Sequence, residues 1–381
     1  MTQPPPPVPD HMQAVQVVEH NAPYQLRTVP VPTIDAEDLG PHDLLVKVAA
    51  ASYCHTDGMV AAGVFGDRLP VTASHEGSGT VVRVGGGGDA SSSGFRVGDR
   101  VMCGLPFHPC GSCGDCRGGQ DGEGIDDEGR QQYCASTEGH VGVHIDGCFA
   151  EYVRVGARFT TKLPQGVSLL RAAPLACAGR TVWRAVLQTG LKRGQWIAIV
   201  GSGGGLGHLG IQFAKKALGL RVIGIDARDE ALTLSDSMGA DATNGPGADA
   251  TVVLSDAPGA AALGCAVTRM HGTVVQVAQP DEVSVPFQEL VFRDIRLKGS
   301  LLCSPAESRA MLEAVAAHGV EVRTNLFRGL DSIGELMERV KGGRVQGKAV
   351  IVVDQRQIDV EEVRSNHAFS WWTLAAGFQS M

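Results

Sequence analysis

Short apolar runs separated by proline and glycine fill the first part of the chain. Four of them are AVQVVEH from Ala14, LLVKVAAAS from Leu44, EGSGTVVRVG from Glu76 and GDRVMCG from Gly98. Short runs rich in β-branched residues and bounded by turn formers are typical of strands. The pattern predicts a strand-rich, partly barrel-like first domain.

The pattern changes near residue 170. LLRAAPLACAGRTVWRAVLQTG from Leu169 has a helical pattern, and residues 196–226 alternate strand, glycine turn, helix and strand. Further apolar runs start at Ala250, Gly272 and Asp294. This alternation is typical of a doubly wound parallel sheet. The run KAVIVVD from Lys348 predicts a last strand that rejoins the first domain.

These patterns divide the chain into three parts. Residues 1–11, which begin MTQPPPPVPD, are expected to be disordered or polyproline II. Residues 12–180 and 322–381 are assigned to the β-rich domain, and residues 181–321 to the doubly wound domain. The tail 355–381 contains AFSWWTLAAGF, which is too short for a membrane span, so we expect it to pack on the body or at a subunit contact.

The bulk composition limits the classes of function. The 381 residues carry a net charge of −8, and no basic stripe favours nucleic acid or an anionic membrane surface. The ten cysteines could form a secreted disulfide framework. However, the polyproline start lacks the apolar region of a secretory signal, and clustered CxxC spacing in an intracellular protein favours metal. We therefore expect a soluble, cytoplasmic protein.

One cluster of cysteines is closely spaced: Cys110, Cys113, Cys116 and, further on, Cys134. Zinc prefers a tetrahedron of soft ligands, and CxxC turns provide several thiolates from one loop. Free buried cysteines are the alternative, but three of them at three-residue intervals beside glycines argue against it. Four thiolates leave no open coordination position, so the cluster predicts a structural zinc.

A second set of ligand types is dispersed: Cys54 in SYCHTDG, His75 and Glu76 in ASHEGSG, and Cys177 in PLACAGRTVW. Two thiolates and one imidazole leave one zinc position open for water or a substrate oxygen, as a catalytic site requires. Each residue alone could equally be a small core cysteine or a core histidine. The residues by themselves leave this choice open.

An apolar strand runs into a turn made of Gly201, Gly204, Gly205, Leu206 and Gly207. Glycine lets the backbone approach a pyrophosphate at a helix N-terminus, although here Ser202 takes the place of the first glycine of GxGxxG. Asp226, which ends the next strand, would accept the adenosine ribose hydroxyls and repel a 2′-phosphate. This favours NAD, while the nearby Arg228 keeps NADP as the alternative.

Together these segments resemble the zinc-containing alcohol dehydrogenases of the medium-chain dehydrogenase/reductase superfamily, and their microbial, yeast-type branch most. The resemblance covers roughly residues 12–354. It rests on CHTD from Cys54, HEG from His75, CAG from Cys177, the cysteine cluster and the glycine turn. It implies an α/β fold, with a GroES-like β-rich catalytic domain that holds both zinc sites and a Rossmann doubly wound parallel-sheet domain that binds NAD.

The resemblance also implies roles around the metal. Cys54, His75 and Cys177 would hold the catalytic zinc, with Glu76 as an adjacent or exchanging carboxylate. Asp57 would orient the imidazole of His75. The four-cysteine cluster would hold a second, structural zinc, which makes two per chain.

Further roles concern substrate and cofactor. Thr56 would hydrogen-bond the substrate oxygen and begin the proton relay. His55 would face the cofactor pyrophosphate, and Thr181 would pack near the nicotinamide. Lys348 stands where the family commonly has an arginine that binds cofactor phosphate.

Four features depart from the family pattern. Met59 replaces the relay histidine, so we expect protons to leave through ribose and water, or more slowly. Ser74 replaces the usual glycine before the zinc histidine. Residues 117–133 resemble a surface insertion. The segment GADATNGPGADATVV from Gly239 is short, so one helix of the cofactor domain is expected to be reduced or lost.

The sequence therefore predicts a zinc-dependent alcohol dehydrogenase that transfers hydride reversibly between an alcohol and NAD. Its expected partners are a small alcohol or aldehyde and further copies of the chain, as a homodimer or homotetramer, with no nucleic acid and no membrane. Phe65 and Phe107 are pocket candidates by position only, and the insertion and tail suggest a role in fungal secondary metabolism. Two alternatives stay open: a zinc-free quinone or enoyl reductase of the same fold, and a non-catalytic NAD(H)-binding sensor.

Overall fold

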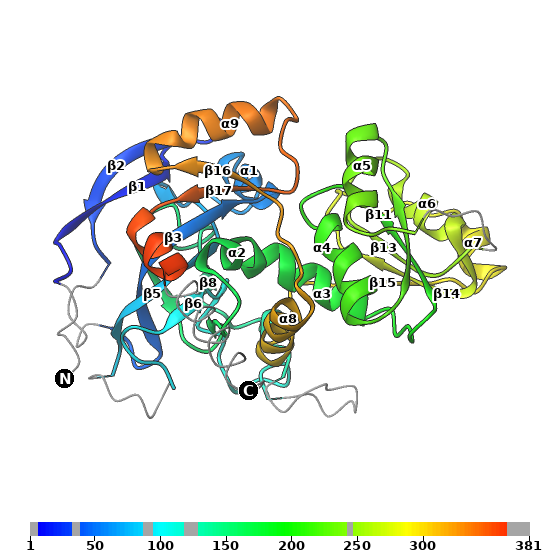
Figure 1. Cartoon of the computed structure of the whole chain (residues 1–381), viewed down its shortest axis with the longest axis horizontal. Helices are drawn as coiled ribbons and strands as arrows, with labels where there is room; N and C mark the ends of the chain where they lie inside the picture. The colour runs from blue at the N-terminus through cyan, green and yellow to red at the C-terminus, as the bar shows by residue number, and fades with distance from the viewer. Residues whose placement is uncertain (1–6, 33–38, 87–93, 118–128, 242–246, 364–381) are drawn as a thin grey trace, which may run out of the picture.

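The computed structural model describes residues 7–32, 39–86, 94–117, 129–241 and 247–363. The expectations for residues 1–6, for most of the 117–133 insertion and for the tail beyond residue 363 lie outside these ranges. Figure 1 shows a β-rich part beside a part built on a parallel sheet, with α3, α4 and α8 where the two meet. Within the described residues, none of the helices combines the length and apolarity that a membrane crossing needs.

The β-rich part is built around β3, a long and almost fully buried strand. β3 pairs with β5, β9 and β17, and the central sheet has the order β10-β6-β5-β3-β17-β16. A three-stranded sheet, β2-β1-β4, and the pair β7-β8 lie beside it. The strands are β1 (His11–Val17), β2 (Gln25–Pro30), β3 (Asp43–Tyr53), β4 (Val71–Thr72), β5 (Glu76–Val84), β6 (Arg100–Met102), β7 (Pro106–Phe107), β8 (Gly139–His140), β9 (Tyr152–Gly156), β10 (Thr161–Lys162), β16 (Thr324–Arg328) and β17 (Lys348–Val352). The predicted strands of the first part and the returning last strand are confirmed.

The second part contains a parallel sheet of five strands in the order β12-β11-β13-β14-β15. They are β11 (Trp196–Val200), β12 (Arg221–Ile225), β13 (Ala248–Val253), β14 (Thr268–Gln276) and β15 (Arg296–Gly299). This is the usual doubly wound order without its outermost strand beyond β12. Residues 238–247 are too few for another helix and strand, and those described among them form neither. Compared with the usual doubly wound sheet, the shortened segment therefore lacks a strand as well as the helix that was expected to be reduced or lost.

Helices cover both faces of the parallel sheet and join the two parts (Figure 1). They are α1 (His55–Ala61), α2 (Leu169–Pro174), α3 (Arg180–Leu187), α4 (Gly207–Gln212), α5 (Asp229–Ser237), α6 (Ala260–Val267), α7 (Phe287–Val291), α8 (Pro305–His318) and α9 (Ile333–Lys341). A π-helical turn, Leu175–Gly179, joins α2 to α3 and carries Cys177. π-Helical turns are rare and occur often at functional sites.

The junction between the two parts is held by a fully buried arginine. Arg180 donates hydrogen bonds to the carbonyls of Cys103 and Phe159 in the β-rich part and to Ser308 Oγ in α8, at 2.9 to 3.2 Å. A buried guanidinium is tolerated when oxygens satisfy its donors, as here. Because Arg180 follows the π-helical turn directly, it also fixes the segment that presents Cys177.

The beginning of the C-terminal tail packs on the body, whereas the AFSWWTLAAGF stretch for which packing was expected lies outside the described residues. Residues 355–363 are helical, and Ile358 is buried against β3 and α2. Glu361 accepts a hydrogen bond from the backbone N–H of Leu169 at 2.8 Å, at the first residue of α2. A carboxylate there satisfies one of the free donors of the helix N-terminus.

Candidate active site

The closely spaced cysteines lie together in one loop. Their four sulfur atoms all lie within 4.8 Å of one another: those of Cys110, Cys113, Cys116 and Cys134. Backbone N–H groups point at them, as from Cys113 to Cys110 Sγ at 3.3 Å. A hydrogen bond from the Ser112 side chain, with backbone N–H donors, lowers the pKa of Cys110 to about 5. The loop therefore favours the thiolate form, which a metal requires, at Cys110, whereas burial raises the pKa of Cys116.

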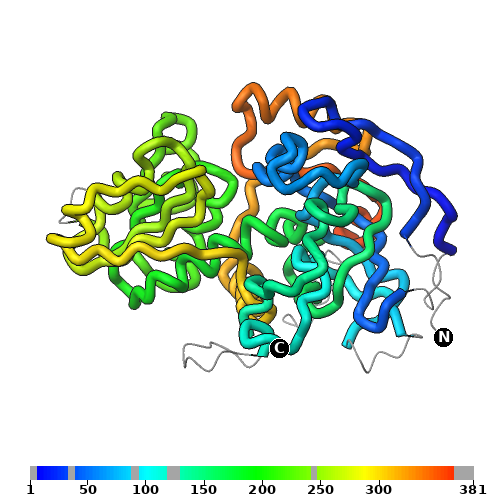
Figure 2. The backbone as a smooth tube through the Cα atoms, turned by 180° about the vertical axis from the view of Figure 1, so that it is seen from behind, coloured from blue at the N-terminus to red at the C-terminus, as the bar shows by residue number. Residues whose placement is uncertain are grey.

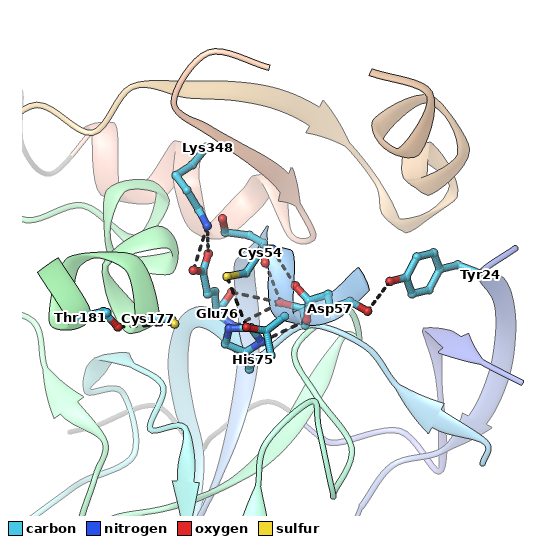
Figure 3. Close-up of polar contacts among 11 residues, drawn as sticks. Tyr24, Cys54, Asp57, His75, Glu76, Cys177, Thr181 and Lys348 are labelled. Carbon is cyan, nitrogen blue, oxygen red and sulfur yellow. Dashed lines mark hydrogen bonds and ion pairs between the residues drawn. The ribbon is translucent and has the colours of Figure 1, made fainter. Parts of the chain in front are cut away.

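The dispersed ligand types meet at the second cluster, where Cys54, His75, Glu76 and Cys177 each place one donor atom within 4.8 Å of the others. Cys54 precedes α1, and Cys177 comes from the π-helical turn. His75 and Glu76 enter from the start of β5. Three separate elements thus converge on one point, which Figure 3 shows in close-up.

The residue before His75 explains how this loop is formed. Ser74 has a φ of 70°, in the left-handed region that favours glycine. Its hydroxyl donates to the carbonyl of Ser52 at 2.9 Å and accepts from the N–H of Glu76 at 3.3 Å. These bonds offset the strain, so the serine that departs from the family pattern is accommodated.

Asp57 holds two of the metal-ligand candidates at once. Its Oδ2 accepts from the N–H of Cys54 at 2.7 Å, and its Oδ1 lies 3.1 Å from His75 Nδ1. Both His75 and Asp57 are almost completely buried. Because Nδ1 faces the carboxylate, Nε2 of His75 is left to face the two sulfurs. The expected orienting contact of Asp57 is present in the geometry.

Glu76 forms a buried ion pair that the sequence did not suggest. The ammonium of Lys348 lies 2.9 and 2.8 Å from the two carboxylate oxygens. Burial raises the pKa of Glu76 to about 8, against the opposing effect of the Lys348 charge. The stem of Lys348 passes under the glycine turn, where a Cβ on Gly205 would lie 2.9 Å from its Cδ. Lys348 thus links the turn to the metal cluster, and Figure 3 shows its contact with Glu76.

The glycine turn between β11 and α4 has the geometry of a close backbone approach. Gly201 has a φ of 84°, and a Cβ on Gly207 would lie 2.3 Å from the carbonyl oxygens of Gly201 and Ser202. Asp226 lies directly after β12 and accepts from the N–H of Gly203 at 3.1 Å. The turn, the start of α4 and Asp226 are therefore side by side, as dinucleotide binding requires.

Gly203 was not singled out in the sequence. A Cβ there would come within 2.4 Å of Ala231 in α5, so this glycine lets the turn pack against the helix after Asp226. Its signal was its place as the first of three consecutive glycines in the GSGGG run.

The remaining predicted residues lie around these two features. Thr56 Oγ1 is 4.0 Å from Cys54 Sγ, and Thr181 Oγ1 is 3.9 Å from Cys177 Sγ. His55 is exposed on α1, and its Nε2 lies 3.9 Å from Oδ2 of Asp256, a residue in the segment after β13. Gly204 and Leu206 complete the turn before α4. Phe107 is only 1% exposed in the core of the β-rich part, so its placement as a substrate-pocket residue was wrong.

The donor atoms of the buried cluster fit a zinc ion. Nε2 of His75 is buried and has no hydrogen-bond partner among the described residues. A buried nitrogen without a partner is costly unless a ligand completes it. Two sulfurs and one imidazole nitrogen are a donor set that zinc uses at catalytic sites with an open position.

Comparison with known proteins defines the class. Residues 40–165 match the alcohol dehydrogenase GroES-like domain, and residues 205–317 match the zinc-binding dehydrogenase domain. An alcohol dehydrogenase of Geobacillus stearothermophilus is 32% identical over 360 residues, covering 90% of this chain and all of the relative. The crystal structure of the alcohol dehydrogenase of Aeropyrum pernix has a TM-score of 0.76 at 30% identity, covering 89% of this chain and 99% of that one.

A solved NAD-dependent alcohol dehydrogenase is similar as well, with a TM-score of 0.77 at 25% identity over 90% of this chain and all of that one. The chain therefore belongs to the zinc-containing alcohol dehydrogenases of the medium-chain dehydrogenase/reductase superfamily. Members of this class are oxidoreductases that act on CH–OH groups. Nothing in these findings supports a role in fungal secondary metabolism.

Proposed function

We propose that the chain oxidises a small alcohol with NAD, and reduces the aldehyde or ketone in the reverse direction, at the cluster of Cys54, His75 and Cys177. The observation that carries this is Nε2 of His75, which lacks a hydrogen-bond partner in the described part of the chain and faces two sulfurs. The Glu76–Lys348 ion pair connects this cluster to the glycine turn. The full ligand set argues against the zinc-free reductase alternative, because such an enzyme has no use for it.

The carboxylate of Asp226 supports NAD as the cofactor. It lies at the end of β12, where it can accept ribose hydroxyls and repel a 2′-phosphate. Arg228 Nε lies 3.7 Å from Asp226 Oδ1, so its charge is partly directed to that carboxylate. The similar solved protein named as NAD-dependent points the same way.

The two bound groups, zinc and NAD, would supply the Lewis acid that lowers the pKa of the alcohol and the acceptor for its hydride. The residues of the chain do the rest. Asp57 keeps the proton of His75 on Nδ1, so that Nε2 stays free to bind metal. Thr56, half-buried beside Cys54, offers its hydroxyl to the substrate oxygen and receives its proton. Met59, one helical turn after Thr56 in α1, is not titratable and cannot receive that proton in turn.

The experiment is a steady-state screen of primary and secondary alcohols with NAD and with NADP. We expect turnover with NAD and a lower kcat/KM with NADP. An Asp226→Gly variant should narrow that difference, because it removes the carboxylate that repels the 2′-phosphate. Binding of NADH without any turnover across the screen would instead favour the sensor alternative.

We further propose that residues 12–180 with 322–381 form the catalytic domain and 181–321 the cofactor domain, which the membership of the sheets supports. We also propose a homodimer or homotetramer joined through the cofactor domain. β15 is an open edge of its sheet, and Phe287, Val291 and Phe292 beside it are exposed. All ten cysteines are unpaired, which supports a reducing, cytoplasmic compartment.

A further inference from the structure

The segment that leaves the parallel sheet after β15 has an unusual conformation. Leu302 has a φ of 44° although it is a buried leucine, and Ser300 Oγ is buried with no partner among the described residues. A branched residue in the left-handed region is strained and persists only where its surroundings hold it. We call residues 300–302 the crossover, because they lead from β15 into α8.

The crossover lies where a dinucleotide would end. Ligands of doubly wound sheets bind outside the carboxyl ends of the strands. Asp226 follows β12 at one edge of this sheet, and the crossover follows β15 at the other edge. A dinucleotide whose adenosine ribose is at Asp226 and whose pyrophosphate is at the glycine turn therefore extends toward the crossover.

A residue of the four-cysteine loop holds the crossover. The hydroxyl of Tyr133, the residue before Cys134, accepts a hydrogen bond from the backbone N–H of Leu301 at 3.2 Å. Leu301 is the second residue after the end of β15, and the bond joins segments that are 168 residues apart in the chain. In Figure 2 the yellow segment leaving the sheet runs to the turquoise loops of the β-rich part.

The ring of Tyr133 is partly exposed and is contacted by a buried arginine of the junction. Arg184 in α3 lies over it, with Cζ 5.9 Å from the ring centroid. Arg184 Nη1 also lies 2.7 Å from both carboxylate oxygens of Glu307, in the first turn of α8. Both of these charged side chains are buried. A chain of contacts therefore connects the crossover to Tyr133 of the four-cysteine loop, then to Arg184 in α3 and to Glu307 in α8.

We propose that Tyr133 is a positioning residue for the cofactor. Its hydroxyl, carried by the four-cysteine loop, holds the crossover in the strained conformation that faces the nicotinamide half of NAD. This inference rests on the proposed NAD-dependent function. A metal held by the four cysteines would then have a second role beyond local stability, since it would order the loop that carries Tyr133.

The test compares Tyr133→Phe with Tyr152→Phe. The first variant removes only the accepting hydroxyl and keeps the ring against Arg184. The second is a matched change in β9, remote from the crossover. NADH affinity is measured by fluorescence titration, and amide hydrogen exchange by mass spectrometry on peptides that contain Leu301. Zinc content and the KM and kcat for NAD and alcohol are measured in parallel.

We expect Tyr133→Phe to raise the NADH Kd and the NAD KM about five-fold, the size of effect expected for one net hydrogen bond. Exchange at Leu301 should become faster, while kcat changes less and zinc stays at the wild-type level. Tyr152→Phe should match the wild type. These readouts separate positioning from a merely structural role, which would leave the NADH Kd unchanged.

Two results would overturn the proposal. An unchanged NADH Kd in Tyr133→Phe, with or without faster exchange, would mean that the crossover does not serve the cofactor, while turnover with NAD would leave the proposed function standing. If the wild type itself bound no NADH, the proposed function would fail, and the inference with it.

Discussion

The two metal-ligand clusters of this chain are built in opposite ways. The four-cysteine site takes all its donors from one loop, and two of its cysteines are partly exposed. The catalytic cluster takes its donors from the residue before α1, from the start of β5 with the residue before it, and from the π-helical turn, and it is almost wholly buried. One loop supplies all the ligands of the four-cysteine site. The ligands of the catalytic cluster come together only when the chain has folded.

The surroundings differ in the same way. Backbone N–H groups and a serine hydroxyl support the sulfurs of the four-cysteine loop. Charged side chains surround the catalytic cluster: Asp57 contacts His75, and Lys348 is paired with Glu76. A structural metal site needs only neutral hydrogen-bond donors from its own loop. A catalytic metal site must also contact the regions that bind the substrate and the cofactor. The following variants test whether the two sites really divide stability and catalysis between them.

The largest effect is expected from Cys54→Ala. Loss of one of three ligands should remove the catalytic zinc and lower turnover by about 10³-fold or more, because Lewis-acid stabilisation supplies several kcal/mol. Zinc should fall from two ions per chain to one, with little change in unfolding temperature. Cys265→Ala, at a buried cysteine of α6, is the matched control. A variant that retained full turnover would contradict the assignment.

Cys113→Ser should produce the reverse pattern. Removal of one thiolate weakens the four-cysteine site, and we expect a loss of about 3 kcal/mol in unfolding free energy, since metal affinity contributes directly to folding. Urea unfolding and zinc analysis measure this. At low temperature the folded fraction should keep most of its kcat. If kcat fell as far as in Cys54→Ala, the division between the two sites would be wrong.

Asp57→Asn tests the support of the catalytic cluster without touching a ligand. The neutral amide cannot stabilise the Nδ1–H of His75 as the carboxylate does, so zinc affinity or kcat should drop by about 10- to 100-fold. Competition with a chelator gives the affinity. Asp43→Asn changes another buried carboxylate that contacts a histidine, His108, outside the cluster, and it should leave zinc affinity unchanged. An equal loss in both variants would indicate a general effect of buried charge.

The smallest effect concerns the joint between the two parts. His208 in α4 donates from Nδ1 to the carbonyl of Gly204 and accepts at Nε2 from the N–H of Arg323, each at 3.1 Å. Burial lowers its pKa to about 4. The unfolded chain therefore binds the proton first, and stability contributed by neutral His208 is present above pH 6.5 and lost as pH falls toward 4.

Between pH 7 and pH 5.5 the wild type should lose about 1 kcal/mol more unfolding free energy than His208→Gln, which keeps a donor and an acceptor but does not titrate. Urea titrations at the two pH values measure the difference. Equal losses would show that His208 does not carry this linkage.

The sequence predicted the local features well and the contacts between distant segments only in part. The four cysteines, the glycine turn and the strands could be located because their signals lie within a few residues. Cys54, His75 and Cys177 could be joined only through the family resemblance, since no local pattern connects three elements so far apart. Contacts such as Lys348 with Glu76 and Tyr133 with Leu301 had no signal, because nothing in the chain near either partner reports the other. Phe107 failed for a related reason, since position alone does not say which face of a short strand is covered.

Zinc per chain, measured by elemental mass spectrometry before and after mild chelation, tests the central claim most directly when turnover is followed in the same samples. The account predicts two zinc ions, with chelation first removing the one at Cys54, His75 and Cys177 and abolishing turnover while the chain stays folded. A protein that turned over alcohol with NAD at full rate while holding only the zinc of the four-cysteine loop would contradict it.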